Sequence, residues 1–346
     1  MNEQPLPPNH VLVELLTQAS AKADTEQRQR ALRRAGRAAF MWPVEAAEVQ
    51  RRGEPLTTLP QVGPWVAAQM LALAGNKPAA PPPERAGFHT WSEATALAPQ
   101  FDGRVVCDLQ AHTLWSDGHS TTADMLEASA ARGYGHVLIT DHSQELSVAH
   151  GLTPDRFEEQ WREFDELAGR FPLRILRGIE MNIDEQGRGD MPESTLSQLD
   201  VILGAFHAKL RLKTDQTERY LAAVRNPWVD VLAHPRCRMY NARVGLQADW
   251  PRVFAEAARL DKAVEADGYI ARQDLDIDLL RVAAEAGVRI SFGSDAHHVV
   301  DLPYITFSIG AAVAAGVAPE RVINCMPADE LTAWAASHRP LPTPSP

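Results

Sequence analysis

Seven stretches of the chain share one pattern, in which a short apolar run ends at a polar residue able to bind a metal ion. They are residues 104–112, 137–142, 175–180, 201–207, 229–234, 263–267 and 289–297. Short Val/Ile/Leu runs are typical of parallel strands buried on both faces. Because α/β barrels place their active sites at the carboxyl ends of such strands, we expect these polar residues to converge on one rim.

Amphipathic helical patterns separate the stretches, at residues 122–132, 154–170, 216–224, 250–260 and 274–286. This alternation predicts a parallel sheet with outer helices, which right-handed crossovers would close into a barrel. Seven expected strands rather than the usual eight indicate a distorted barrel. The predicted fold class is therefore α/β, with a distorted (β/α)7 barrel over residues 101–338.

The pattern differs before the barrel. Residues 1–76 have helical periodicity and predict a small all-α domain, whose last helix follows a tight turn at Leu59-Pro-Gln-Val-Gly63. Residues 77–100 are rich in proline and small residues, which predicts a stiff, extended linker. The proline-rich tail, residues 339–346, is expected to be disordered.

Composition narrows the class of protein. With 45% hydrophobic and 23% charged residues, no signal-peptide pattern and no apolar run of membrane-spanning length, the sequence predicts a soluble cytoplasmic protein without membrane contact. Its three cysteines are scattered and fit reduced thiols. The net charge of −11 is uneven: residues 1–100 hold ten Lys/Arg against nine Asp/Glu, and the remainder 24 against 36. Bound divalent ions would offset part of this excess, so an acidic polymer is not excluded as a substrate.

Imidazole and carboxylate groups together suit zinc, manganese or iron. One histidine at a strand end is more often a hydrogen-bonded core residue, but several candidates at equivalent ends favour metal ligands. The pattern thus indicates a metallohydrolase with more than one metal ion.

Specific motifs carry a resemblance to a known family. Asp108-Leu-Gln-Ala-His112 leads to Ser116-Asp-Gly, Thr140-Asp-His-Ser follows, and Ser294-Asp-Ala-His297 comes late in the chain. With Glu180, His207 and His234, this order resembles the polymerase and histidinol phosphatase (PHP) family of metal-dependent phosphoesterases, over about residues 104–334. It is most similar to the PHP domain of bacterial family X DNA polymerases.

The resemblance implies three divalent ions, manganese or zinc, with iron or magnesium as alternatives. It assigns Gln110, His112, Glu180 and Asp295 to the first ion, Glu180, His207 and His234 to the second, and Asp117, His142 and His297 to the third. Of these residues, His112, His142 and Asp295 are expected to be essential for catalysis. Many relatives have histidine at the position of Gln110. A neutral amide oxygen is a weaker ligand for zinc, so the first site should favour manganese or magnesium.

Phosphate recognition needs further cations. Lys209, Arg243 and Arg272 follow expected strands and are candidates for substrate binding, as is His150 in a loop near the rim. For the two arginines, a solvated or salt-bridged role is the competing interpretation. Glu265 and Asp267 could orient the ligand imidazoles, or could be simple strand-end residues.

The N-terminal residues resemble the small helical domain of family X polymerases, which ends in a DNA-binding helix-hairpin-helix. Two positions depart from that hairpin: Gln61 replaces a glycine and Trp65 a basic residue. The resemblance implies DNA contacts through Gly63 and through a run of arginines that includes Arg30, Arg33 and Arg34. Here too, a solvated helix face is the alternative.

Lyase chemistry is not expected, because the only lysines of this region, Lys22 and Lys77, lie at its edges. A polymerase palm does not fit into the short linker. The sequence therefore predicts a metal-dependent phosphoesterase acting on DNA phosphodiesters, as a 3′–5′ exonuclease or at abasic sites and damaged 3′ ends. One alternative is a phosphatase for small phosphomonoesters of the histidinol-phosphatase type. Another is a non-catalytic DNA-repair scaffold with structural metal ions.

Overall fold

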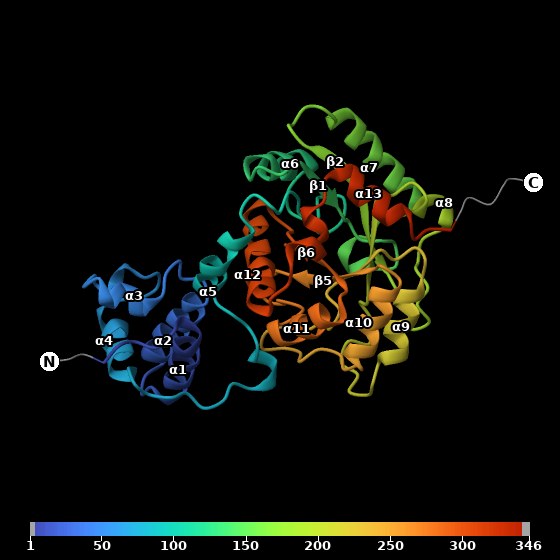
Figure 1. The fold of residues 1–346 in the computed structure, drawn as a ribbon. Helices are drawn as coiled ribbons and strands as arrows, with labels where there is room; N and C mark the ends of the chain where they lie inside the picture. Colours follow the sequence, from blue (N-terminus) through green and yellow to red (C-terminus); the bar gives the residue numbers. More distant parts are fainter. Residues whose placement is uncertain (1–3, 341–346) are drawn as a thin grey trace, which may run out of the picture. The chain divides into compact units, whose positions relative to one another are not determined.

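The structure is a computed structural model that describes residues 4–340. It divides into two compact units, Met1–Leu97 and Ala98–Pro346 (Figure 1). Within the described residues, no helix is both long and apolar enough to cross a membrane.

The first unit is helical. Its helices are α1 (Asn9–Lys22), α2 (Glu26–Ala39), α3 (Ala46–Arg51), α4 (Pro64–Leu73) and α5 (Trp91–Leu97). The Thr25 hydroxyl accepts a hydrogen bond from the backbone N–H of Arg28 and so caps α2. The turn before α4 places Gln61 at φ +62°, a conformation that favours glycine, and Pro64 begins the helix.

The second half of the expected linker is not extended. Residues 91–97 form α5, which packs within the helical unit because Ser92 donates to Glu45 Oε1 at 2.7 Å and accepts from Asn9 Nδ2 at 2.9 Å. Glu93 accepts from the backbone N–H of Thr90 at 2.8 Å and stabilises the start of the helix. The contacts of Ser92 join residues far apart in the sequence, so a search for apolar periodicity does not find them.

The second unit is a parallel α/β barrel. Its strands are β1 (His136–Ile139), β2 (Arg174–Asn182), β3 (Val201–Ala205), β4 (Val231–Leu232), β5 (Ala263–Asp267) and β6 (Arg289–Gly293). They pair in chain order, and every pair is parallel. The helices are α6 (Thr122–Ala131), α7 (Pro154–Leu167), α8 (Glu193–Leu196), α9 (Thr217–Arg225), α10 (Trp250–Arg259), α11 (Ile277–Ala286), α12 (Ile305–Ala315) and α13 (Ala328–Ala336). The predicted fold class is confirmed.

The seventh expected strand, residues 104–112, lies between β1 and β6 without forming a regular ladder. The N–H of Leu138 donates to the carbonyl of Asp108 at 3.2 Å, and that of Leu109 donates to Phe292 at 3.4 Å. Asp108 explains the irregularity, because its own carboxylate accepts from the N–H groups of Gln110 and Ser294. Side-chain acceptors here replace part of the ladder, while the segment still closes the barrel between its first and last strands.

Two apolar layers support the rim. Inside the barrel, Leu109, Leu138 and Leu203 are fully buried in one cluster that also includes Trp334 of α13. Between the strands and the outer helices, a larger cluster includes Phe157 of α7 and Phe254 of α10. The ends of the strands are therefore held in place from both sides.

The C-terminal tail was expected to be disordered from residue 339. Arg339 is instead placed, with Nη2 at 2.8 Å from the carbonyl of Asp200 and 3.1 Å from Asp230 Oδ2. Residues 341–346 lie outside the described part of the chain.

Candidate metal centre

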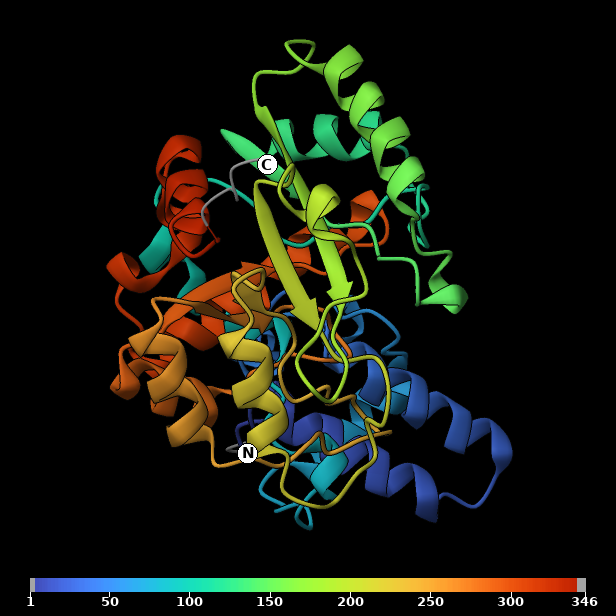
Figure 2. The same ribbon diagram turned by 90° about the vertical axis from the view of Figure 1, so that its right-hand side faces the viewer.

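The carboxyl ends of the strands bring the predicted ligands together at one rim. Figure 2 shows the arrowheads of β2 and β3 pointing toward the same set of loops. Parallel strands all end on the same side of a sheet, so residues far apart in sequence meet there. Three groups of side chains have ligand atoms within 4.8 Å of one another: His112, Glu180 and Asp295; His142, Glu180 and His207; and His112, Asp117, His142 and His297.

Glu180, near the end of β2, lies at the middle of the centre. Its Oε1 is 2.8 Å from His207 Nε2 and 2.7 Å from His234 Nε2. Its Oε2 is 3.3 Å from His112 Nε2 and 2.9 Å from Gln110 Nε2. One carboxylate oxygen therefore faces each of the first two predicted ligand sets, the arrangement expected of a bridging ligand.

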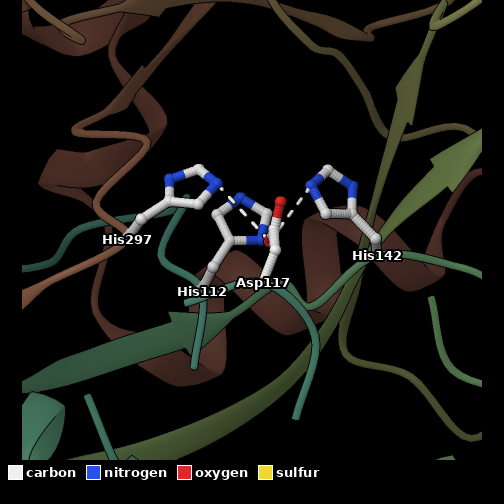
Figure 3. Close-up of side chains that lie close together, drawn as sticks. All are labelled: His112, Asp117, His142 and His297. Atoms are coloured by element: carbon white, nitrogen blue, oxygen red, sulfur yellow. Dashed lines mark ion pairs between the residues drawn. The ribbon is translucent and has the colours of Figure 1, made fainter. Parts of the chain in front are cut away.

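Asp117 lies close to the two histidines of the third predicted set, His142 and His297 (Figure 3). Its Oδ1 is 3.6 Å from His142 Nε2 and 3.5 Å from His297 Nε2. The structure adds His112 to this group, because its ring stacks between those of His142 and His297 with centroids 4.5 Å from each. His142 in turn lies close to Glu180, with Nδ1 3.6 Å from Oε2. The three predicted sets are thus in contact and share residues.

In the centre, buried carboxylates and histidines shift each other's pKa values. Burial disfavours the charge of Glu180, but the surrounding histidines, His142 and His234 foremost, hold its pKa well below the usual range. Burial lowers the pKa of His142 to about 3. For His142, a neutral imidazole beside an ionised carboxylate is the protonation state that metal binding requires. At His112 the carboxylates of Asp295 and Glu180 outweigh burial and raise the pKa.

Hydrogen bonding within the centre is incomplete. Among the described residues, both ring nitrogens of His112 and both carboxylate oxygens of Asp295 are buried and lack a hydrogen bond of good geometry, although His112 Nε2 lies 3.2 Å from Asp295 Oδ1. Gln110 Oε1 also has none. Buried polar atoms are nearly always paired, so these atoms mark positions where a further group belongs. Imidazole nitrogens together with carboxylate and amide oxygens fit divalent manganese, zinc or iron.

The substrate-binding candidates differ in their surroundings. Arg272 is largely buried and lies inside the centre, with Nη1 3.1 Å from Asp295 Oδ2. Arg243 is partly buried and its Nε donates to the carbonyl of Cys237 at 3.0 Å. Lys209 is exposed and forms an ion pair with Glu185. His150 is exposed on the loop after β1, outside the ligand groups.

Two residues that orient the ligands were missed from the sequence. Asn182 Oδ1 lies 2.5 Å from His207 Nδ1, which directs the other ring nitrogen of His207 toward Glu180. Asp141 accepts from Thr113 Oγ1, Ser116 Oγ and Gln160 Nε2, and fixes the loop that carries Asp117. Asn182 could have been found, because it stands two residues after Glu180 and side chains alternate along a strand.

The N-terminal candidates for DNA contact lie around α2 and the turn before α4. Arg34 and Gly63 line one groove. Arg30 forms an ion pair with Glu26, whereas no ion pair of Arg33 or Arg34 is found in the described residues. Among the residues that the structure describes, Arg33 and Arg34 thus have no competing carboxylate, in contrast to Arg30.

No family model matches the chain. Its relatives include the DNA polymerase/3′-5′ exonuclease PolX of Bacillus subtilis, with 32% identity over 67% of this chain and 41% of the relative. A probable phosphatase of Acetivibrio thermocellus is 32% identical over 60% of this chain and 83% of its own length. Among solved structures, the histidinol phosphate phosphatase of Lactococcus lactis is similar over 59% of this chain and 92% of that one, with a TM-score of 0.44 and 15% identity. The chain spans less than half of the polymerase relative.

Proposed function

We propose that the substrate is a phosphodiester of DNA. The chain belongs to the PHP family of metal-dependent phosphoesterases. The observation that carries the proposal is the convergence of imidazole and carboxylate groups around Glu180. Such a centre could hold more than one divalent ion, and the reaction would then need no nucleophilic side chain.

In this proposal the first ion is held by Gln110, His112, Glu180 and Asp295. The second is held by Glu180, His207 and His234, and the third by Asp117, His142 and His297, with His112 adjacent. Divalent ions bound there would lower the pKa of water and neutralise the charge of a phosphate. His112, His142 and Asp295 are the residues whose loss should remove the most activity, because His112 and His142 belong to two ligand groups each and Asp295 joins the first group to Arg272.

The chain's own cations would orient the substrate. The guanidinium of Arg272 lies beside Asp295 and is 20% exposed, so it can donate to a phosphate oxygen that enters the centre. Arg211, Lys213 and Arg243 lie on the loops after β3 and β4, which are joined by a hydrogen bond from Arg211 Nη1 to the carbonyl of Ala242. In the part of the chain that the structure describes, no ion pair of these three is found, which favours a polyanionic substrate.

The relative from B. subtilis supports the choice of DNA, because its name describes a polymerase with 3′–5′ exonuclease activity. The groove next to Arg34 and Gly63 supports it further, since backbone N–H groups at a helix start bind phosphate. Hydrolysis from the 3′ end is therefore the reaction we favour, with abasic or damaged 3′ ends as related substrates.

A small phosphomonoester is the second candidate. The observation that favours it is the set of relatives called probable phosphatases, one of which, from Thermoanaerobacter, is matched over 91% of its length at 27% identity. These relatives match between 60% and 64% of this chain, and their names describe the reaction more directly than the nature of the leaving group.

One series of assays separates the two. The purified chain with Mn²⁺ is given single-stranded DNA labelled at the 5′ end, an abasic duplex, and a panel of phosphomonoesters including histidinol phosphate. Stepwise shortening of the DNA at higher kcat/KM than any monoester supports the proposal. Release of phosphate from monoesters with intact DNA would establish the second candidate instead.

A further inference from the structure

Gln110 and Glu265 come from different parts of the barrel wall, and both side chains lie against Gly293 of β6. Glu265 lies on β5 and Gln110 on the segment that closes the barrel on the other side. A Cβ added at Gly293 would lie 2.3 Å from Glu265 Oε1, 2.8 Å from Gln110 Cβ and 3.0 Å from Gln110 Oε1. Glycine is therefore needed here for clearance.

In each of the two side chains, one terminal polar atom is hydrogen-bonded and the other is not. Glu265 Oε2 accepts from the backbone N–H of His234 at 2.6 Å, and Gln110 Nε2 donates to Glu180 Oε2 at 2.9 Å. Glu265 Oε1 and Gln110 Oε1 are both buried and have no donor among the described residues. Burial, with the neighbouring Asp267, raises the pKa of Glu265 well above its usual range. With this carboxyl ionised, as it would be beside a bound cation, two acceptors lie in one dry space, which is unfavourable for both.

Rotating the amide of Gln110 by half a turn removes this conflict. The oxygen and nitrogen of a glutamine amide occupy nearly the same volume, so the rotation needs no extra space. Nε2 would then donate to Glu265 Oε1, while Oε1 would turn toward Glu180 Oε2. That second contact is repulsive between two oxygens alone and becomes favourable when a cation lies between them.

We propose that Glu265 is the positioning residue that holds Gln110 with its carbonyl oxygen toward the first metal ion. Glu265 needs both oxygens for this, one for the N–H of His234 and one for the amide of Gln110. Gly293 keeps the space between the two side chains open. The inference rests on the first ligand group of the proposed function and extends it to a pair of residues that contact no substrate.

Metal retention tests the pair directly. The probe is Mn²⁺, counted per chain after gel filtration at a limiting concentration, with calorimetric titration for affinity. We expect Glu265→Gln to weaken the binding of one Mn²⁺ by about 10- to 100-fold, the range found for partners of metal ligands. Glutamine offers a single oxygen for two donors, and its NH2 group would hold Gln110 in the wrong orientation. The variant Gly293→Ala, whose methyl group would displace both Glu265 Oε1 and Gln110, should cause the same loss.

A double variant distinguishes a positioning role of Glu265 from a general effect of losing negative charge. Gln110→Ala should also lose one Mn²⁺, and Gln110→Ala/Glu265→Gln should lose no more than either single variant. The control is Asp267→Asn, which removes a buried carboxylate from the same strand that interacts with Arg272 instead. The effect of Asp267→Asn on Mn²⁺ affinity should add to that of Gln110→Ala.

Two results would overturn the inference in different ways. If Gln110→Ala loses one Mn²⁺ while Glu265→Gln retains it, Gln110 is a ligand that Glu265 does not position. If Gln110→Ala retains every ion of the wild type, the ligand assignment of the proposed function is itself wrong at this residue. Thermal unfolding in a chelator, measured for each variant, confirms that the barrel is folded in the comparison.

Discussion

Glu180 shows how far single residues could be assigned from the sequence. Its role between two ligand sets was expected from the resemblance, and its two oxygens do face different histidines. What the sequence could not give is how the sets overlap. The stacking of His112 between His142 and His297 depends on three separate chain segments, and no spacing rule describes the angle at which they meet.

At this scale we predict that His142→Ala or Asp295→Ala reduces phosphoester hydrolysis by more than the roughly 10- to 100-fold that loss of an outer partner of a ligand costs. The barrel should remain folded, because its inner apolar layer includes neither side chain. Turnover by the Mn²⁺-loaded variants and their circular dichroism are the measurements. His10→Ala, an exposed histidine on α1 of the helical unit, serves as the matched control. Wild-type turnover in either ligand variant would remove that residue from the site.

Gln110 should set the metal preference of the first site. We expect Gln110→His to tighten zinc binding and to shift activity from manganese toward zinc, because imidazole is the softer ligand. Zinc and manganese contents of the purified proteins, together with activity in each ion, test this. Identical metal content and preference in wild type and variant would show that residue 110 is not a ligand.

At the scale of elements, six of the seven expected strands are present, and the exception is informative. Short Val/Ile/Leu runs identify buried strands well because burial on both faces leaves little choice of side chain. Residues 104–112 have the same composition, but Asp108 diverts backbone N–H groups from the ladder. Helix α5 was missed for a related reason, since polar contacts of Ser92 and Glu93 fix it.

The prediction at the scale of elements concerns DNA binding by the arginine face of α2, which consists of Arg30, Arg33 and Arg34. Arg30→Glu/Arg33→Glu/Arg34→Glu should weaken binding to single-stranded DNA and reduce the log–log salt slope by about 0.7 for each lost phosphate contact. We expect Arg33 and Arg34 to account for most of the loss, because Arg30 already forms an ion pair with Glu26. Fluorescence anisotropy at several salt concentrations measures it.

The control for the arginine face is Arg51→Glu/Arg52→Glu at the C-terminal end of α3, where both side chains pair with Glu48. Hydrolysis of a small phosphomonoester should be unchanged in the α2 variant. If DNA binding and monoester hydrolysis fall together, the helical unit supports the stability of the barrel and does not bind DNA.

The whole molecule combines a near-neutral helical unit with an acidic barrel. Ten Lys/Arg against nine Asp/Glu precede residue 101, and 24 against 36 follow. A barrel with this charge would repel DNA unless cations gather at the rim, where Arg211, Lys213 and Arg243 lie. The sequence count alone could not show this, because it does not say which arginines are already paired with carboxylates.

The division into units also decides which polymerase chemistry is possible. Within residues 4–340, α4 ends at Leu73 and the barrel unit begins at Ala98, with only α5 and a short helical turn between them. Nucleotide addition requires carboxylates that hold two metal ions beside a primer end, and the intervening residues are too few for a domain that could present them. We therefore predict that the purified chain extends no primer. A primed template with four deoxynucleotides and Mn²⁺ tests this, and a control without nucleotides reports exonuclease shortening on the same gel. Template-dependent incorporation of even one nucleotide would mean that a nucleotide-binding centre exists outside the residues assigned here.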